Sequence, residues 1–277
     1  MSFTSVQSSL FNHQITKYFA IAQISGKTSK TYIANLIARS SSIAIRMWIY
    51  FQIYQAAFLK LGVPDLQGVT LPMLIWIQMI AQSLEGVNRP SIDKVISEEI
   101  QSGELAYVVS RPYSYPLFHA FSFIGRSIPV LLGNLIIGVI TVLFLVGMVR
   151  LSIPGMILGL INLTLGFVLH FSISLLIGLT ALWLEDPSAL RWIYNKAQLV
   201  FGGVMLPLAL FPESLRNIVE YTPFAQLYYS AAQQIIFYDP WLFIKSLTIQ
   251  LAWITIVIGS CFLLFQYSKA HLSTNGG

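Results

Sequence analysis

Only a few side chains in this 277-residue sequence could perform acid–base or metal chemistry, because charged residues make up 10% of it. The most suggestive are the adjacent carboxylates Glu98 and Glu99, and the imidazoles of His119 and His170. Paired carboxylates can serve as a general acid and a general base, and histidine can assist them. Neither histidine, however, stands at a spacing from the glutamates that completes a metal or base site. The sequence therefore does not favour an enzyme.

Other catalytic and nucleotide-binding patterns are incomplete in this sequence. In membrane proteases with paired glutamates, an arginine follows four residues after the second glutamate, where this sequence has Gly103. Gly26-Lys27-Thr28 matches the end of a phosphate-binding loop, but the first glycine of that loop would fall at Ile21. The single Cys261 has no partner for a disulfide or a cysteine metal site. We therefore expect no cofactor in this chain, and an intramembrane enzyme is a less favoured alternative.

The composition is that of a membrane protein. Hydrophobic residues make up 56% of the sequence and the mean hydropathy is +0.71, whereas soluble domains are about 25% charged. The net charge of +5 could suggest nucleic acid as a partner, but the basic residues are scattered singly along the chain. We attribute them to orientation in the membrane, where basic residues concentrate on the cytoplasmic side. No nucleic-acid partner is expected.

The apolar runs predict an all-α polytopic membrane protein with six transmembrane helices. A hydrocarbon core of about 30 Å requires about 20 residues of helix. Six runs approach or exceed that length: 36–60, 69–87, 126–149, 154–183, 194–212 and 241–267. Lysine and arginine are more frequent on the side that holds the N-terminus, so we expect both termini in the cytoplasm and an even number of crossings. The transmembrane domain is thus predicted as residues 36–267, with a cytoplasmic tail at 268–277.

The N-terminal residues 1–35 are predicted to form a helix on the cytoplasmic surface of the membrane. Phe11, Ile15, Tyr18 and Phe19 share one helical face. Lys17 and Lys27 are available to anionic lipid headgroups, as in other interfacial helices. A frayed polar tail is the alternative.

A polar segment, residues 88–116, separates the second and third predicted spans and would lie in the cytoplasm. Within it, residues 92–101 alternate between apolar and charged faces with helical periodicity, and Gly103 is a natural helix stop. Such a helix could dock a soluble partner or lie on lipid headgroups. Its net negative charge favours docking, because anionic leaflets attract basic faces.

A second segment, residues 205–240, would lie outside the membrane or dip partly into its outer leaflet. It is mostly apolar but is interrupted by Pro207, Pro212, Pro223 and Pro240, and proline ends helices. We expect two short broken helices, at 214–221 and 224–237, as a re-entrant region that covers a pathway. An ordinary external loop is the alternative.

Polar and bulky side chains within the predicted spans are candidates for the pathway or for structural contacts. His170 could face a substrate pathway, or it could bond a carbonyl or hydroxyl of a neighbouring span. Polar groups at this depth are costly, so Arg46 and Glu85 are predicted to form a structural ion pair. Four further residues could line a pathway or simply pack in the interior: Met205, Phe211, Phe224 and Tyr228.

Short motifs give the chain a resemblance to a known family. Ile100-Gln101-Ser102-Gly103-Glu104-Leu105, followed by Val108-Val109-Ser110-Arg111-Pro112, is similar to a pattern of type-2 ATP-binding-cassette (ABC) export permeases. So are Leu206-Pro207-Leu208, Phe211-Pro212-Glu213 and Tyr221-Thr222-Pro223-Phe224. The similarity covers nearly the whole chain, although Ser110 stands where the pattern usually has leucine.

The resemblance implies an exporter subunit of the bacterial plasma (inner) membrane whose motor is a separate polypeptide. Two ATPase subunits would hold ATP and Mg, and a second permease, identical or paralogous, would complete the pathway within the membrane lipids. The helix at 92–101 would be the coupling helix, with its apolar stripe seated in a groove of the ATPase. The implied coupling residues are Ile92, Asp93, Lys94, Val95, Ile96, Glu98, Glu99, Ile100, Gly103 and Arg111.

A carrier or channel that needs no ATPase is the remaining alternative. Carriers commonly show internal repeats with broken helices, and we find no repeat between residues 36–149 and 154–267. The transported cargo is left open.

Overall fold

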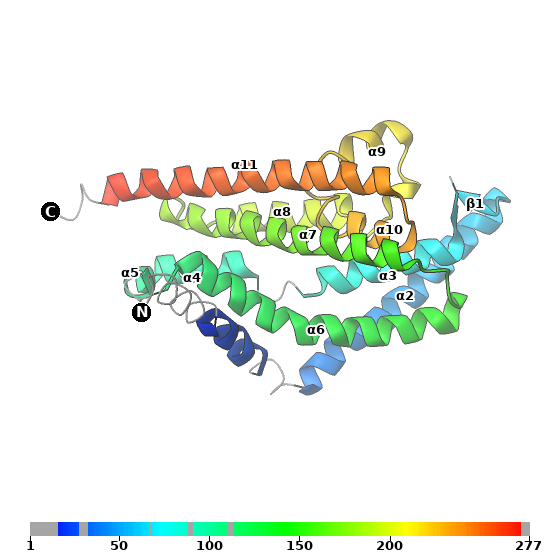
Figure 1. Cartoon of the computed structure of the whole chain (residues 1–277), viewed down its shortest axis with the longest axis horizontal. Coiled ribbons are helices and arrows are strands. Elements are labelled where there is room, and N and C mark those ends of the chain that lie inside the picture. The colour runs from blue at the N-terminus through cyan, green and yellow to red at the C-terminus, as the bar shows by residue number, and fades with distance from the viewer. Residues whose placement is uncertain (1–15, 28–32, 67, 88–90, 110–112, 273–277) are drawn as a thin grey trace, which may run out of the picture.

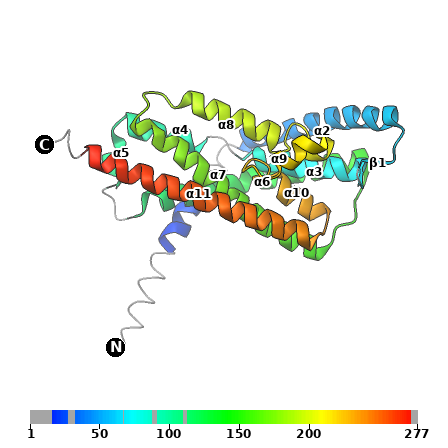
Figure 2. The same cartoon turned by 90° about the horizontal axis from the view of Figure 1, so that it is seen from above.

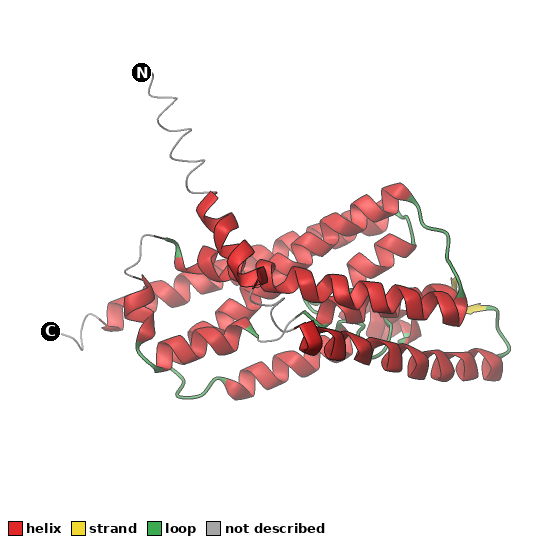
Figure 3. Ribbon diagram, turned by 90° about the horizontal axis from the view of Figure 1, so that it is seen from below, coloured by secondary structure: helices red, strands yellow, loops and turns green. Residues whose placement is uncertain are grey.

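A computed structural model describes residues 16–27, 33–66, 68–87, 91–109 and 113–272. Helices make up almost all of the regular structure of these residues, which confirms that the fold is all-α (Figure 3). The exception is a two-residue antiparallel pair of strands, β1 (Asp65–Leu66) and β2 (Val69–Thr70), in which Asp65 is opposite Thr70.

Four long helices set the length of the molecule. They are α2 (Ile33–Leu61), α6 (Tyr115–Val146), α7 (Ile153–Leu179) and α11 (Pro240–Leu272). Helix α7 packs against α11 on one side, while α6 packs against α2. Helices α6, α7 and α11 all extend along the long axis of the molecule (Figure 1). Helix α11 continues to Leu272, so the predicted boundary of a tail at 267 falls inside a helix.

The shorter helix α3 (Leu71–Glu85) lies in the interior between these long helices. Every residue from Leu74 to Leu84 is buried, and the helix contacts α2, α6 and the short helix α10 (Tyr229–Ile236). An apolar helix buried on all sides needs no polar face. Its 15 residues give a length of about 22 Å at 1.5 Å per residue.

Three helices among the described residues are long and apolar enough to cross a membrane, within residues 115–146, 153–182 and 240–264. The other three predicted spans do not meet this standard. Helix α2 has 29 residues but carries Arg46 and several other polar side chains. Helices α3 and α8 (Ser188–Phe201), with 15 and 14 residues, are shorter than the roughly 20 residues that a 30 Å core requires.

The predicted fifth span at 194–212 is wrong in its bounds. Helix α8 begins at Ser188 and ends at Phe201, where Gly202 and Gly203 follow. The chain then forms a one-turn 3-10 helix, η2 (Leu208–Leu210), and the short helix α9 (Glu213–Val219). The prolines interrupt the chain here as expected. The second predicted short helix starts later than expected, at Tyr229, because turns occupy the residues after Pro223.

The helical N-terminal residues 16–27 pack on α6. Tyr18 is buried, its ring centroid lies 5.4 Å from that of Phe121, and its hydroxyl accepts a hydrogen bond from the backbone N–H of Ser114 at 3.0 Å. A helix is therefore confirmed over the described part of this region. Phe11 and Ile15, on which its predicted apolar face also relied, lie outside the described residues.

Two more short helices, α4 (Ile92–Gln101) and α5 (Glu104–Val109), connect α3 to α6. They lie at the end of the molecule where α11 ends, whereas β1 lies at the opposite end (Figures 1 and 2). The chain thus has two distinct ends, and the predicted coupling helix is at one of them.

Candidate functional site

Helix α4 has the bounds that the sequence predicts, Ile92 to Gln101. The helix ends before Gly103, whose φ of 76° lies in the left-handed region that glycine adopts without strain. Helix α5 follows directly at Glu104. Arg111, also predicted for this site, lies outside the described residues.

The apolar stripe of α4 is buried within this chain. Ile92 and Ile96 are 1% and 0% exposed, and α4 packs against α7. Gly178 of α7 makes the close approach possible, because a Cβ at that position would lie 2.8 Å from the Cβ of Ile96. Val95 and Ile100 are half-buried. The expectation that this stripe seats in a groove of another protein is therefore corrected, since its most buried residues pack on α7.

Asp93, one of the implied coupling residues, is buried and forms an ion pair with Arg191 of α8. The side chains of Asp93 and Arg191 are 3% and 19% exposed. Arg191 Nη2 also donates to the hydroxyl of Ser97 at 3.3 Å. Asp93 therefore connects α4 to α8. The sequence offered little signal for Arg191 beyond its place next to the acidic turn Glu185-Asp186-Pro187.

The turn that precedes α8 is fixed by its own hydrogen bonds. The hydroxyl and the backbone N–H of Ser188 donate to the Asp186 carboxylate at 2.6 and 2.8 Å. These bonds hold the pKa of the Asp186 carboxyl below its ordinary value, because they favour its charged form. Gln101 reaches the same turn from α4 and donates to the carbonyl of Glu185 at 2.6 Å.

Glu99 connects α4 to the first turns of α6. The hydroxyl of Tyr115 donates to Glu99 Oε2 at 2.6 Å, and His119 Nε2 lies 3.1 Å from the same oxygen. Both partners on α6 are buried. Glu99 was predicted among the coupling residues, whereas Tyr115 and His119 were not assigned to this site. Their contact with α4 depends on how α4 folds back onto α6.

One stripe of α4 remains exposed. Lys94, Glu98 and Gln101 lie at i, i+4 and i+7 and form what we call the α4 outer stripe. Lys94 Nζ lies 3.6 Å from Glu98 Oε1. Beyond it on α5, Glu104 is exposed and Tyr107 is 64% exposed. This surface carries both charge signs and an aromatic ring, and it is available to another protein.

His170 is buried and bonded to a neighbouring helix. Its Nδ1 lies 2.7 Å from the hydroxyl of Tyr194 on α8, and its Nε2 lies 3.4 Å from the hydroxyl of Ser174. This arrangement fits the structural alternative, in which a hydroxyl of a neighbouring helix satisfies the imidazole. A role in a pathway stays a prediction.

The other predicted pathway residues differ in their burial. Phe211 and Tyr228 are buried in the core, and the Tyr228 hydroxyl donates to Gln198 Oε1 at 3.3 Å. Phe224 packs near Tyr194 with a ring-centroid distance of 6.2 Å, while Met205 is exposed. A large cavity of about 1100 Å³ lies elsewhere, between α6, α7 and α11, and its described lining includes none of these residues. No pattern in the sequence predicts this cavity, because its walls are mostly ordinary apolar side chains.

The predicted ion pair of Arg46 with Glu85 is not among the ion pairs that join described residues. Arg46 Nε is buried and has no hydrogen-bond partner in the described part of the chain. Residues 16–27, 33–66, 68–87, 91–109 and 113–272 contain no group of three or more His, Cys, Asp or Glu that could hold a metal ion.

These features define an all-helical membrane protein in which α4 contacts α6, α7 and α8 and keeps one exposed stripe. Comparison with known families identifies the class further: residues 43–271 match the model of the ABC-2 family transporter proteins. The chain belongs to this family, which confirms the resemblance seen in its motifs. Members of this family are normally non-catalytic membrane subunits, and an ABC transporter implies ATPase partners. A search of curated proteins found no match.

Proposed function

We propose that this chain is the permease subunit of an ABC exporter and that a separate ATPase docks on the α4 outer stripe. The observation that supports this proposal best is the set of connections made by α4. The helix bonds to α6 through Glu99 and to α8 through Asp93, and it packs against α7 through Ile96. A partner that displaces α4 would therefore displace three other helices.

In this proposal, α4 and both termini are cytoplasmic and the chain lies in a bacterial inner membrane. The excess of lysine and arginine on the segments of that side supports this orientation. Two ATPase subunits would bind ATP and Mg, and a second permease, identical or paralogous, would form the pathway with this chain. The cargo is not assigned.

The division of α4 into two faces suggests separate roles for its residues. Ile92, Ile96, Asp93 and Glu99 would fix the helix to the transmembrane bundle, so that it moves with the bundle as one unit. Lys94 and Glu98 would meet charges of the ATPase, and Tyr107 could anchor the contact, as aromatic residues do at the centres of interfaces. Nucleotide-driven closure of the ATPases would then push α4 and change the access of the pathway.

The test is a charge swap, Lys94→Glu with Glu98→Lys, in the full chain co-expressed with candidate ABC ATPases. The swap keeps an oppositely charged i, i+4 pair within α4 but reverses the charge that a partner meets at each position. We expect capture of the ATPase by the purified permease to fall about tenfold or more, as for like charges brought together at an interface. Lys60→Glu, at the exposed end of α2, is the control and should leave capture unchanged.

Undiminished capture by the swapped chain would place the docking site elsewhere. Transport by the reconstituted permease with no ATPase present would instead favour the carrier alternative. The two outcomes separate the position of the docking site from the class of transporter.

A further inference from the structure

The cavity between α6, α7 and α11 lies in an apolar setting. Its walls come from the helices that qualify as membrane spans and from Tyr113 and Ser114, which immediately precede α6. If these helices cross the membrane, hydrocarbon surrounds the cavity. Its volume of about 1100 Å³ is slightly larger than the roughly 300–1,000 Å³ of sites that bind small molecules. A large apolar occupant fits these two facts.

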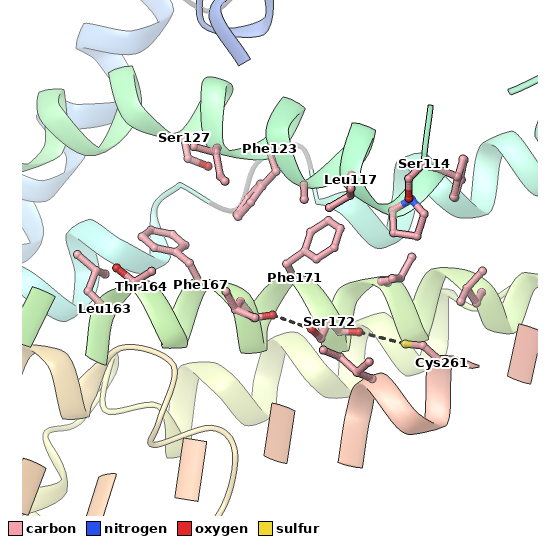
Figure 4. A pocket seen from close by; sticks show the side chains of 18 of the residues that line it. Ser114, Leu117, Phe123, Ser127, Leu163, Thr164, Phe167, Phe171, Ser172 and Cys261 are labelled. Carbon is pink, nitrogen blue, oxygen red and sulfur yellow. Dashed lines mark hydrogen bonds between the residues drawn. The ribbon is translucent and has the colours of Figure 1, made fainter. Parts of the chain in front are cut away.

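The walls of the cavity are bulky rather than small. Phe167 and Phe171 project from α7 toward α6, and Phe123 and Leu117 project back from α6 (Figure 4). Helix α11 adds Phe262 and Cys261. Transmembrane helices that pack closely on one another use small residues at their contact. These walls therefore favour flexible hydrocarbon chains over a helix of a second copy as the occupant.

The position of the cavity along α7 suggests which part of a lipid it would hold. The wall extends from Leu160 to Leu179 on α7. Counted from Ile153, a hydrocarbon core of about 30 Å ends after about 20 residues, near residue 173. The part from Leu160 to Phe171 is then about 17 Å long at 1.5 Å per residue, which is close to the depth of one leaflet.

The end of the cavity nearer α4 carries tyrosine side chains. Beyond that hydrocarbon boundary its walls are Leu175 and Leu179 on one side, and Tyr113, Ser114 and Tyr115 on the other. Tyrosine is typical of the membrane–water interface, where its ring meets headgroups. The cavity thus has an apolar length followed by an interfacial end, as an amphipathic lipid does.

From these observations we propose that the cavity binds one diacyl phospholipid of the leaflet on the α4 side. Its acyl chains lie between Phe123, Phe167 and Phe171, and its headgroup lies beside Ser114. The site is separate from the α4 outer stripe, so the proposal does not depend on ATPase docking. It assigns this face of the molecule to a bound lipid rather than to the cargo pathway.

The first test fills the cavity in the full-length chain. Ala120→Trp places an indole in the α6 wall, whereas Leu132→Trp adds the same group on α6 at a residue that is 54% exposed and not in the described lining. After delipidation in detergent, native mass spectrometry counts the phospholipids retained per chain. We expect retention in the parent and in Leu132→Trp, and about tenfold less in Ala120→Trp, because overpacking opposes binding. Circular dichroism checks that both variants fold.

Equal retention in all three proteins would overturn the proposal, because the lipids would then be bound without regard to the cavity. Loss of retention in both variants, with both still folded, would overturn it equally. A parent chain that retains no phospholipid but forms a dimer that Ala120→Trp abolishes would show that a second copy occupies the cavity.

The second test uses Cys261, the single cysteine of the sequence, which lines the cavity. We expect its reaction with a methanethiosulfonate reagent to accelerate about tenfold on delipidation, as a protecting ligand leaves. Added palmitoyl-oleoyl phosphatidylethanolamine should restore the slow rate. In the control Cys261→Ser, Leu263→Cys, the thiol is at a position that is 70% exposed and its rate should not change. Equal changes at both positions would refute a bound lipid, and full protection by a single-chain lysophospholipid would refute the two-chain assignment.

Discussion

Arg191→Met is the substitution that most directly tests how α4 is connected to the rest of the chain. Methionine keeps the apolar stem of the side chain but removes the guanidinium that pairs with Asp93 and bonds Ser97. The carboxylate of Asp93 would then remain buried without its cation. No other ion pair between described residues involves Asp93.

The expected loss of unfolding free energy follows from the burial of the Asp93 and Arg191 side chains, which are 3% and 19% exposed. Removing one partner of a buried pair typically costs about 3–5 kcal/mol, because the remaining charge is uncompensated. An exposed pair would cost only about 0–1 kcal/mol. Because Arg191 retains some contact with solvent, we expect a cost near the lower limit, about 3 kcal/mol.

The assay is reversible unfolding of the purified chain in mixed micelles, which gives the free energy of unfolding of the parent and the variants. The double variant Asp93→Asn, Arg191→Met removes both charges and should recover most of the loss, since replacing a whole buried pair is often nearly neutral. The ATPase activity of the assembled transporter is measured in parallel. We expect Arg191→Met to lower this activity, because α8 would no longer follow α4.

A loss below about 1 kcal/mol for Arg191→Met would refute the reasoning, because the pair would then behave as an exposed one. A double variant that is less stable than the single one would also contradict it. In that case the asparagine and methionine side chains, rather than the unpaired carboxylate, would account for the loss.

Other changes at the contacts of α4 have expected outcomes of their own. Gly178→Ala should cost about 1–3 kcal/mol of unfolding free energy by overpacking, since its Cβ would lie 2.8 Å from that of Ile96. Ile96→Ala removes the Cγ2 that would lie 2.9 Å from the new Cβ, so the double variant should lose less than the sum of the two single losses; a fully additive loss would mean that another contact is responsible. Tyr115→Phe should cost about 1.5–3 kcal/mol, the contribution of a hydrogen bond to a charged group, because it removes the donor to Glu99. Tyr238→Phe, at a ring that is 51% exposed, is the matched control, and an equal loss in both would show that the Glu99 bond contributes little.

Much of the secondary structure could be predicted because its signals are local. The apolar periodicity of residues 92–101 and the glycine at 103 set both ends of α4 correctly. The prolines between 207 and 240 correctly predicted a broken segment. The fifth span was predicted with wrong bounds because its apolar composition continues past Gly202 and Gly203, although the helix ends at Phe201.

The partners of the candidate site were much harder to predict. Asp93 and Arg191 are 98 residues apart in sequence, and no local pattern pairs them. The periodicity of α4 identifies an apolar stripe but does not say whether α7 or another protein covers it.

The sequence by itself determined that this is a helical membrane protein with an amphipathic helix between α3 and α6, because hydropathy and periodicity depend on neighbouring residues alone. It also carried the motifs of the ABC-2 family. Only the tertiary structure decided which face of α4 is free and where the large apolar cavity lies. Both depend on how helices distant in sequence pack together, and side chains that fill a contact have the same composition as side chains that line a cavity.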